Sequence, residues 1–164
     1  MEIPKYQKII NAIEDRFLEI NRGNGYYSDL GEHVYVNKSN KLIASSDESA
    51  INIQDISCTV QGPRSGGMVN YFDHALLIES TLHFIGGTAI TEIREGIADV
   101  MRAIGEDITW DGLAINTYPP EGSEFFVLVY DHEEQIIVGA KVYFIVEFRT
   151  SQWLMTEHDL ISLS

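Results

Sequence analysis

Apolar residues recur with a helical period at the start of the chain. Between residues 4 and 21 they are separated by steps of four and three, which places them on one face of a helix: Tyr6, Ile10, Ile13, Phe17 and Ile20. Pro4 suits the first turn of a helix, and Gly23 suits a position just past its end. The pattern therefore predicts an amphipathic helix over residues 4–21.

A second apolar stripe with the same period lies in residues 89–107. Its members are Ile90, Ile93, Ile97, Val100, Met101 and Ile104. Thr88 can cap this helix with its hydroxyl group, and Gly105 can end it. Gly96 lies inside the stripe, where a glycine costs about 1 kcal/mol relative to alanine unless close packing compensates.

Other stretches of the chain are rich in β-branched or alternating apolar residues, which predicts strands. They span residues 34–36, 50–60, 74–84, 112–118, 125–130 and 136–150. Along the last stretch, the even-numbered residues from 138 to 148 are apolar and point one way. The opposite face carries Lys141, Tyr143, Glu147 and Arg149, so it is at least half solvated or faces a partner.

The order of the main elements is α-β-β-α-β-β-β, which predicts an α+β fold with one antiparallel sheet and two amphipathic helices packed on one face. The 164 residues, of 18.5 kDa, suit a single domain over residues 1–164. We find no internal repeat, no basic leader and no apolar run near the roughly 18 residues of a membrane span. We expect a soluble, intracellular protein.

Charge narrows the choice of partners. Eleven Lys and Arg against 25 Asp and Glu give a formal net charge of −14. A protein that neutralises phosphates needs cations, so a specific nucleic-acid binder is disfavoured. Attachment to an anionic membrane through basic residues is disfavoured for the same reason.

Candidate catalytic and metal-binding chemistry is sparse. The five histidines lack the spacing of a helical metal-ligating pair, and the single cysteine, Cys58, excludes a cysteine cage. Cys58 lies among strand-forming residues, where we expect a buried small hydrophobic side chain. No nucleophile elbow, dinucleotide fingerprint or phosphate loop is present. We expect no cofactor, no metal and no enzymatic activity.

Two groups of acidic residues offer an alternative. Glu106, Asp107 and Asp111 form one group, and Asp131, Glu133 and Glu134 form the other. Such carboxylates can bind a divalent cation or serve acid–base chemistry. The second group lies in a predicted turn, residues 131–135, where solvated carboxylates are the ordinary arrangement.

The connection over residues 61–73 is unusual. Its glycines predict a flexible loop, yet it carries residue types that are enriched at protein interfaces: Arg64, Met68, Tyr71 and Phe72. An apolar and aromatic cluster is unfavourable in water, which favours a partner-binding loop over an ordinary hairpin tip.

The segment NGYYSDLGEHVYV after the first helix resembles a motif of small phage tail proteins. There, a helix runs into a G-Y-x-[ST]-D-x-G-x-x-V turn. The residues that match this pattern in order are Gly25, Tyr26, Ser28, Asp29, Gly31 and Val34. The later order of strands and helix also fits. Over residues 5–153, the chain is therefore similar to the tail-terminator family of long-tailed bacteriophages, the U-type minor tail proteins and their prophage relatives.

This resemblance implies a structural protein without catalytic residues. Members of the family form a homohexameric ring on the tail tube, stop its polymerisation and present a surface to the head. The implied partners are further copies of the chain, the major tail tube protein and the head–tail connector protein, while DNA passes through the lumen without specific binding. The implied location is the host cytoplasm during assembly and then the virion tail. Residues 37–49 and a C-terminal tail over residues 154–164 depart from the family pattern.

Two other classes of function stay open. The chain can be another neck or tail-completion protein of the same particle. It can also be a small α+β enzyme or ligand-binding module with an acidic cleft. Ring formation distinguishes the structural functions from the last class.

Overall fold

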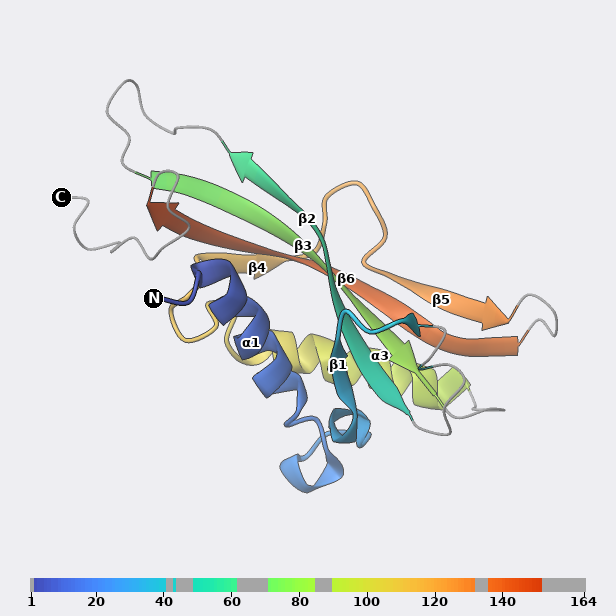
Figure 1. Ribbon diagram of the computed structural model, residues 1–164. Coiled ribbons are helices and arrows are strands. Elements are labelled where there is room, and N and C mark those ends of the chain that lie inside the picture. The colour runs from blue at the N-terminus through green and yellow to red at the C-terminus, as the bar shows by residue number, and fades with distance from the viewer. Residues whose placement is uncertain are drawn as a thin grey trace.

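The computed structural model describes residues 2–40, 43, 49–61, 71–84, 90–131 and 136–151. In this part of the chain, two α-helices pack on one face of a six-stranded sheet (Figure 1). The helical elements are α1 (Lys5–Phe17), η1 (Arg22–Asn24), η2 (Leu30–Glu32) and α3 (Ile90–Glu106). The strands are β1 (Val34–Val36), β2 (Ala50–Gln61), β3 (Tyr71–His83), β4 (Asn116–Tyr118), β5 (Phe126–Asp131) and β6 (Ile136–Ser151). The predicted α+β class is confirmed.

The sheet has the order β1-β2-β3-β6-β4, and β5 also pairs with β6. Five of its pairs are described, and the one between β1 and β2 is parallel, with Val34 opposite Ile51. The prediction of a wholly antiparallel sheet is therefore wrong at this edge. Parallel neighbours need a connection of about a dozen residues or more, and the chain between Val36 and Ala50 is long enough to supply it.

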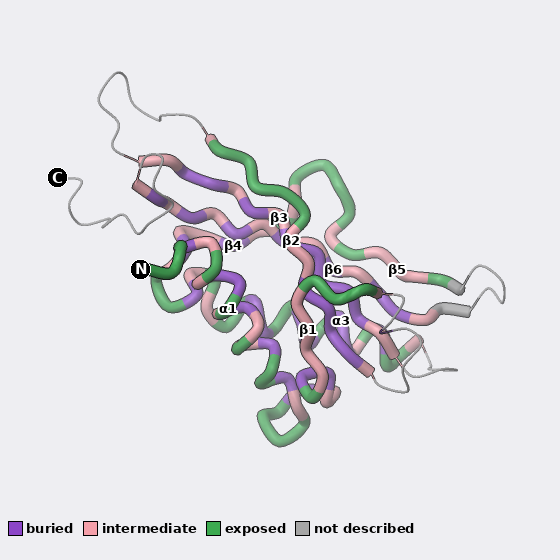
Figure 2. Tube along the Cα trace, viewed as in Figure 1, coloured by how far each residue is buried: buried purple, intermediate pink, exposed green. Residues whose placement is uncertain are grey.

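The core lies between the helices and one face of the two long central strands. β3 pairs with β6 along its whole length, and their even-numbered residues face the helices. The buried members of this face are Leu76, Ile78, Ser80, Leu82, Ala140, Val142, Phe144, Val146 and Phe148. Figure 2 shows buried and partly buried positions alternating along β6 from residue 141, whereas β3 is buried at every position from Ile78 to Leu82. The predicted apolar face shared by even-numbered residues of 74–84 and 138–148 is confirmed.

Helix α1 ends at Phe17, earlier than the predicted residue 21. Ile20 is nevertheless fully buried in the core, as the helical period predicted for its side chain. The chain turns here because Gly31 packs against the end of the helix, where its N–H donates to the Ile20 carbonyl at 2.8 Å. The apolar period thus extends beyond the helix that it predicts.

The start of the predicted loop 37–49 packs against β2. Asn52 is fully buried, and its side-chain amide bonds both backbone groups of Lys38 and the Asn40 side chain. Asn40 also bonds Gln54 on β2 and His83 on β3. This segment therefore covers part of the sheet rather than extending from it.

Helix length and polarity bear on membrane insertion. Within the described part of the chain, no helix is both long enough and apolar enough to cross a bilayer.

Candidate functional site

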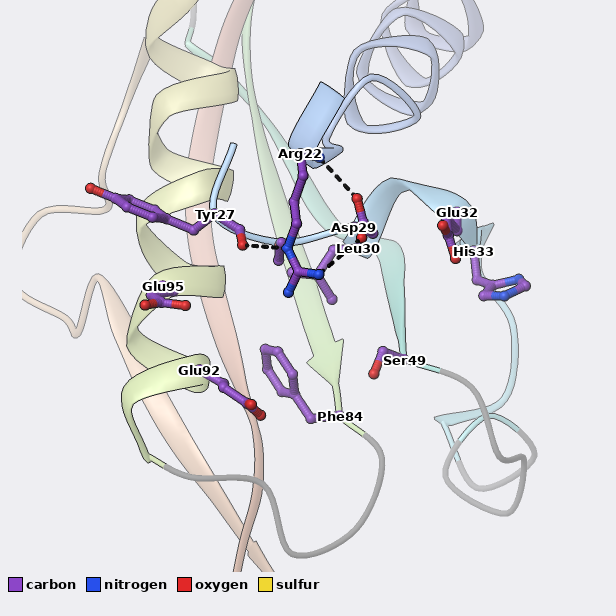
Figure 3. Close-up of a pocket in the computed structure, with 11 residues that line it drawn as sticks. Arg22, Tyr27, Asp29, Leu30, Glu32, His33, Ser49, Phe84, Glu92 and Glu95 are labelled. Atoms are coloured by element: carbon purple, nitrogen blue, oxygen red, sulfur yellow. Dashed lines mark hydrogen bonds and ion pairs between the residues drawn. The ribbon is translucent and has the colours of Figure 1, made fainter. Parts of the chain in front are cut away.

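A polar pocket of about 320 Å³ opens where the turn after α1 meets the beginning of α3. The turn supplies one wall, α3 supplies the other, and the end of β3 and the start of β2 close the space between them (Figure 3). Its lining comprises Arg22, Tyr27, Ser28, Asp29, Leu30, Glu32, His33, Ser49, Phe84, Glu92 and Glu95. The pocket therefore lies within the motif that carries the family resemblance.

Asp99 fixes this turn to α3. Its carboxylate is only 1% exposed. It accepts the backbone N–H groups of Tyr27 and Ser28, both at 2.9 Å, and the Ser28 hydroxyl at 2.6 Å. Three donors on a buried carboxylate satisfy groups that would otherwise be desolvated without partners. The Ser28 of the motif is therefore an anchoring residue, with its hydroxyl committed to Asp99.

The first half of the motif is held by the last turn of α3. The Tyr26 hydroxyl donates to Glu106 at 3.0 Å, and the Arg102 guanidinium lies 4.4 Å from the centre of the Tyr26 ring. Arg102 also donates to the Gly25 carbonyl at 2.6 Å. Burial, followed by the hydrogen bond to Glu106, raises the pKa of Tyr26 to about 12. The ring is therefore neutral, and its role is to pack.

Two glycines permit the close approach of elements around the pocket. A Cβ at Gly31 would lie 2.6 to 2.8 Å from the carbonyl oxygens of Phe17, Leu18 and Ile20. A Cβ at Gly96 would lie 2.6 Å from the Phe84 ring. Gly96 is therefore closely packed, which is the condition under which a glycine inside a helix is compensated.

The pocket is negatively charged. Asp29, Glu32, Glu92 and Glu95 all line it, and Arg22 is the one arginine or lysine among its described lining residues. Arg22 is committed locally, since its guanidinium lies 3.5 Å from Asp29 and donates to the Tyr27 carbonyl at 3.1 Å. In Figure 3, Glu92 and Glu95 lie on the α3 side and Glu32 lies on the opposite side. Carboxylates on two walls favour a cationic group over an anionic one.

The predicted partner-binding loop is only partly described. Arg64 and Met68 lie outside the described residues, so their role stays a prediction. Tyr71 and Phe72 are not loop residues, because β3 begins at Tyr71 and pairs both with the end of β6. The Arg149 guanidinium lies 3.9 Å from the centre of the Tyr71 ring.

Arg149 links β6 to β3 at this end of the sheet. It forms a two-pronged ion pair with Asp73, at 2.7 and 3.3 Å, and Asp73 is 2% exposed. The hydrogen bond to Asp73 raises the pKa of Arg149 further above its usual value. No local pattern in the sequence marks this pair, because its members are 76 residues apart.

The first group of predicted acidic residues has a structural role. One Asp107 oxygen accepts the N–H and hydroxyl of Thr109, and the other accepts the Asp111 N–H at 2.8 Å. These hydrogen bonds, led by the Thr109 hydroxyl, lower the pKa of Asp107 to about 2. Side chains of the second group, at 131–134, lie outside the description. Among the described side chains, no group of three or more His, Cys, Asp or Glu is placed to hold a metal ion.

Cys58 is exposed, so its predicted burial is wrong. It lies on the half of β2 beyond Asp55, where all five residues from 56 to 60 are exposed. A β-rich apolar context predicts a strand, but it does not predict whether a helix covers that strand.

Asp99 is the residue of the candidate site that was not predicted from the sequence, and it anchors the motif turn. The signal in the sequence was slight, because Asp99 is the one charged residue between Glu95 and Arg102. A buried carboxylate requires hydrogen-bond donors, and here the donors come from the motif turn.

No model of a known protein family matches the chain, and a search of curated proteins gives no match.

Proposed function

We propose that this chain is a structural tail protein of a bacteriophage or prophage, which forms a ring on the tail tube, stops tube polymerisation and presents the joining surface for the head. Its partners in this role are further copies of itself, the tube protein and the head–tail connector. It assembles in the host cytoplasm and remains in the virion tail.

The observation that carries this proposal is the coherence of the motif. The residues from Gly25 to Gly31 form one turn that is fixed to α3 through Asp99, Tyr26 and Arg102. A chance match to a turn motif does not require its residues to share one anchored element. The order of β2, β3, α3 and the later strands also agrees with the order of elements on which the resemblance rests.

The net charge also suits a ring around DNA. With a formal charge of −14 per copy, a lumen lined by this chain repels the duplex evenly and does not hold it. Repulsion between copies is screened by salt over about 8 Å at physiological ionic strength. Low salt should therefore favour monomers, and moderate salt should favour the ring.

Electron microscopy of tail tubes tests the proposal. Tubes assembled from the tube protein alone should grow to varied lengths, while tubes assembled with this chain should be shorter and end in a ring. An unrelated acidic protein of similar size serves as the control for charge. Tubes that keep growing and carry no ring would contradict the proposal.

Another neck or tail-completion protein of the same particle is the nearest alternative. Imaging the ring on isolated tails distinguishes the two, because a completion protein docks on an already terminated tube. This alternative would be favoured if the chain binds to terminated tubes and does not bind to bare tubes.

The polar pocket favours a second candidate function, a small ligand-binding module. Three carboxylates, on Glu32, Glu92 and Glu95, line this space of about 320 Å³, which is large enough to admit a small cation. Calorimetric titration with spermidine tests this candidate. Saturable binding that is lost in the Glu92→Gln/Glu95→Gln variant would support ligand binding. If the same variant still terminates tubes as well as the parent chain, ligand binding and ring formation are independent functions.

A further inference from the structure

The sheet has two open edges, one on each side of its central strand pair. On one side, β1 pairs with β2 only as far as Ile53, and no described strand pairs with β2 beyond it. On the other side, β5 pairs with β6, and no described strand pairs with its outer edge. In Figure 1, the far half of β2 and strand β5 lie toward opposite ends of the sheet. Unpaired edges are templates for pairing with another chain.

Both edges lack the charges that usually protect such strands. The open half of β2, which we define as Ile56–Val60, and residues 126–130 of β5 contain no charged residue. Ile56 and Val60 are 50% and 48% exposed, and Phe126 is 45% exposed. In a chain with 36 charged residues out of 164, two uncharged and exposed strand edges are candidates for an interface.

The backbone groups at both edges are directed outward at alternate residues. The Tyr143 N–H donates to the Phe125 carbonyl, so Phe125 and Val127 direct their backbone groups to β6, and Leu128 directs its groups outward. On β2, Ile51 and Ile53 bond outward, to His33 and Asn37. The extra residue of the bulge between Asp55 and Ser57 moves this outward set to Cys58 and Val60.

The directions of the two edges are compatible. β2 is antiparallel to β3, β3 is antiparallel to β6, and β5 is antiparallel to β6. β2 and β5 therefore run in opposite directions. When a second copy lies beside the first with its helices on the same side, β5 of one copy meets β2 of the next as an antiparallel pair.

The side chains on the helix side of the two edges are also complementary. Phe126 and Leu128 form a groove with α3 of about 410 Å³, lined mainly by apolar residues and including the exposed Met101. On the helix side of β2, Cys58 and Val60 lie opposite Leu76 and His74 and are exposed. In the joined sheet they lie beside this groove, so each copy covers apolar surface that its neighbour leaves exposed.

We infer that copies of this chain join head to tail by pairing the open half of β2 in one copy with the outer edge of β5 in the next. This inference rests on the proposed ring and names its interface. Across the sheet, Cys58 pairs with Leu76 on β3, which pairs with Val146 on β6. Leu128 on β5 pairs with Ala140 on β6, six residues before Val146. The joint therefore shifts each copy along the strands by six residues, about 20 Å. Sheet twist and a regular shift of this kind are what close strands into a barrel.

A symmetric dimer is the competing arrangement. Two β5 edges can pair about a two-fold axis, but the open half of β2 then stays exposed in both copies. Head-to-tail pairing closes both edges in every copy and ends in a ring when the rotation closes.

Disulfide trapping tests the joint, because Cys58 is the only cysteine and lies on one edge. Leu128→Cys places a second thiol on the groove side of the other edge, within the 4.4 to 6.8 Å Cα separation that a disulfide needs. Val127→Cys is the matched control, since its side chain points to the opposite face of the sheet. After mild oxidation in moderate salt, Leu128→Cys should give a ladder of covalent trimers and larger species on a denaturing gel.

The parent chain and Val127→Cys should give no covalent species larger than a dimer. A Leu128→Cys product that stops at the dimer, or an equal ladder from the control, would overturn the joint. A second measurement uses Val60→Pro, which removes an outward N–H and leaves the pairing with β3 intact. It should abolish oligomers in light scattering at an unchanged melting temperature, while Val60→Thr should retain them.

The two proposals fail separately. A ladder from a chain that leaves tail tubes growing would support the joint and contradict the terminator function. Tubes capped by a chain that gives no ladder would support the function and overturn the joint.

Discussion

The two halves of β2 differ although their sequences are similar. Ala50, Ile51 and Ile53 are fully buried, whereas Ile56 is 50% exposed and every residue from there to Val60 is exposed. Figure 2 shows this change along the strand. Both halves carry β-branched residues and both pair with β3. The difference therefore comes from what lies on the other edge and on the faces of the strand.

Other elements of the fold cover the first half of β2, and contacts outside β2 hold these elements in place. The motif turn, anchored by Asp99, leads through η2 into β1, and β1 pairs with β2 at residues 51–53. Asn52 is then enclosed by the backbone of Lys38 and the side chain of Asn40. Past Asp55 this cover ends. The motif turn therefore completes the core at one end of β2, while the other end, Ile56–Val60, stays exposed.

Shortening one isoleucine in each half should give the largest contrast. Ile53→Ala should lower the free energy of unfolding by about 2–5 kcal/mol, because it leaves a cavity in the core. Ile56→Ala should lower it by no more than about 0.5 kcal/mol, because the side chain is already half in water. Urea unfolding at pH 7 measures both values. Equal losses would contradict the division of the strand.

Removing the anchor of the turn should have the next largest effect. Asp99→Ala leaves two backbone N–H groups and the Ser28 hydroxyl without their acceptor, which should cost about 3 kcal/mol. Asp99→Asn keeps one acceptor oxygen and should lose less. Arg94→Ala, at an exposed position of the same helix, should change the value by less than about 0.5 kcal/mol. A loss for Asp99→Ala no larger than that of Arg94→Ala would contradict the role of Asp99 as the anchor of the turn.

Filling the contact between the turn and α1 should cost somewhat less. Gly31→Ala brings a methyl group against three backbone carbonyls, which cannot move as a side chain can, and should destabilise by about 1–3 kcal/mol. Gly105→Ala is the matched control, since a Cβ at this helical position meets nothing within 4 Å. It should stabilise the chain by up to about 1 kcal/mol. The melting temperature should fall in Gly31→Ala and rise in Gly105→Ala, as measured by thermal unfolding.

Acidification should destabilise the end of the sheet beside the open half of β2, with the smallest effect. His74 lies 3.9 Å from Cys58 and stacks on Phe148. Burial lowers the pKa of His74 below its ordinary value of 6.5, Lys5 lowers it further, and Asp73 opposes the shift. The pKa of His74 is lower in the folded state than in the unfolded state. The contribution of neutral His74 to the free energy of unfolding is therefore fully present above pH 6.5 and is lost as the pH falls through the folded-state pKa.

Urea unfolding between pH 8 and pH 5.5 checks this prediction. The free energy of unfolding should decrease toward pH 5.5, and His74→Gln should have a flatter dependence on pH. His83 contributes in the same direction, since burial and Lys141 lower its pKa, so a residual slope is expected. An unchanged slope in His74→Gln would exclude His74 as a cause.

Much of the fold was predictable because it depends on local periods. A step of three or four residues places Ile13 and Phe17 on one face of a helix. Alternation along a strand places Val142 and Phe144 on the face opposite to that of Lys141 and Tyr143. These relations hold within a few residues of the chain. Both helices, the long strands and the buried face of β6 follow from them.

The candidate site was less predictable because its contacts are distant in sequence. The motif residues were recognisable, but their acceptor, Asp99, lies about 70 residues away. Tyr71 was assigned to a loop because glycines precede it, whereas its position in β3 depends on pairing with Ser151. No local pattern specifies such a partner.

The sequence by itself determined which residues form helices and strands and which of their faces are apolar, because these are properties of short segments. Only the tertiary structure decided that β1 is parallel to β2, that α1 stops where Gly31 packs against it, and that Ile53 is buried while Ile56 is exposed. The physical reason is that burial and strand pairing are satisfied by groups far along the chain, and the same residue types are stable in either environment once their partners are present or absent.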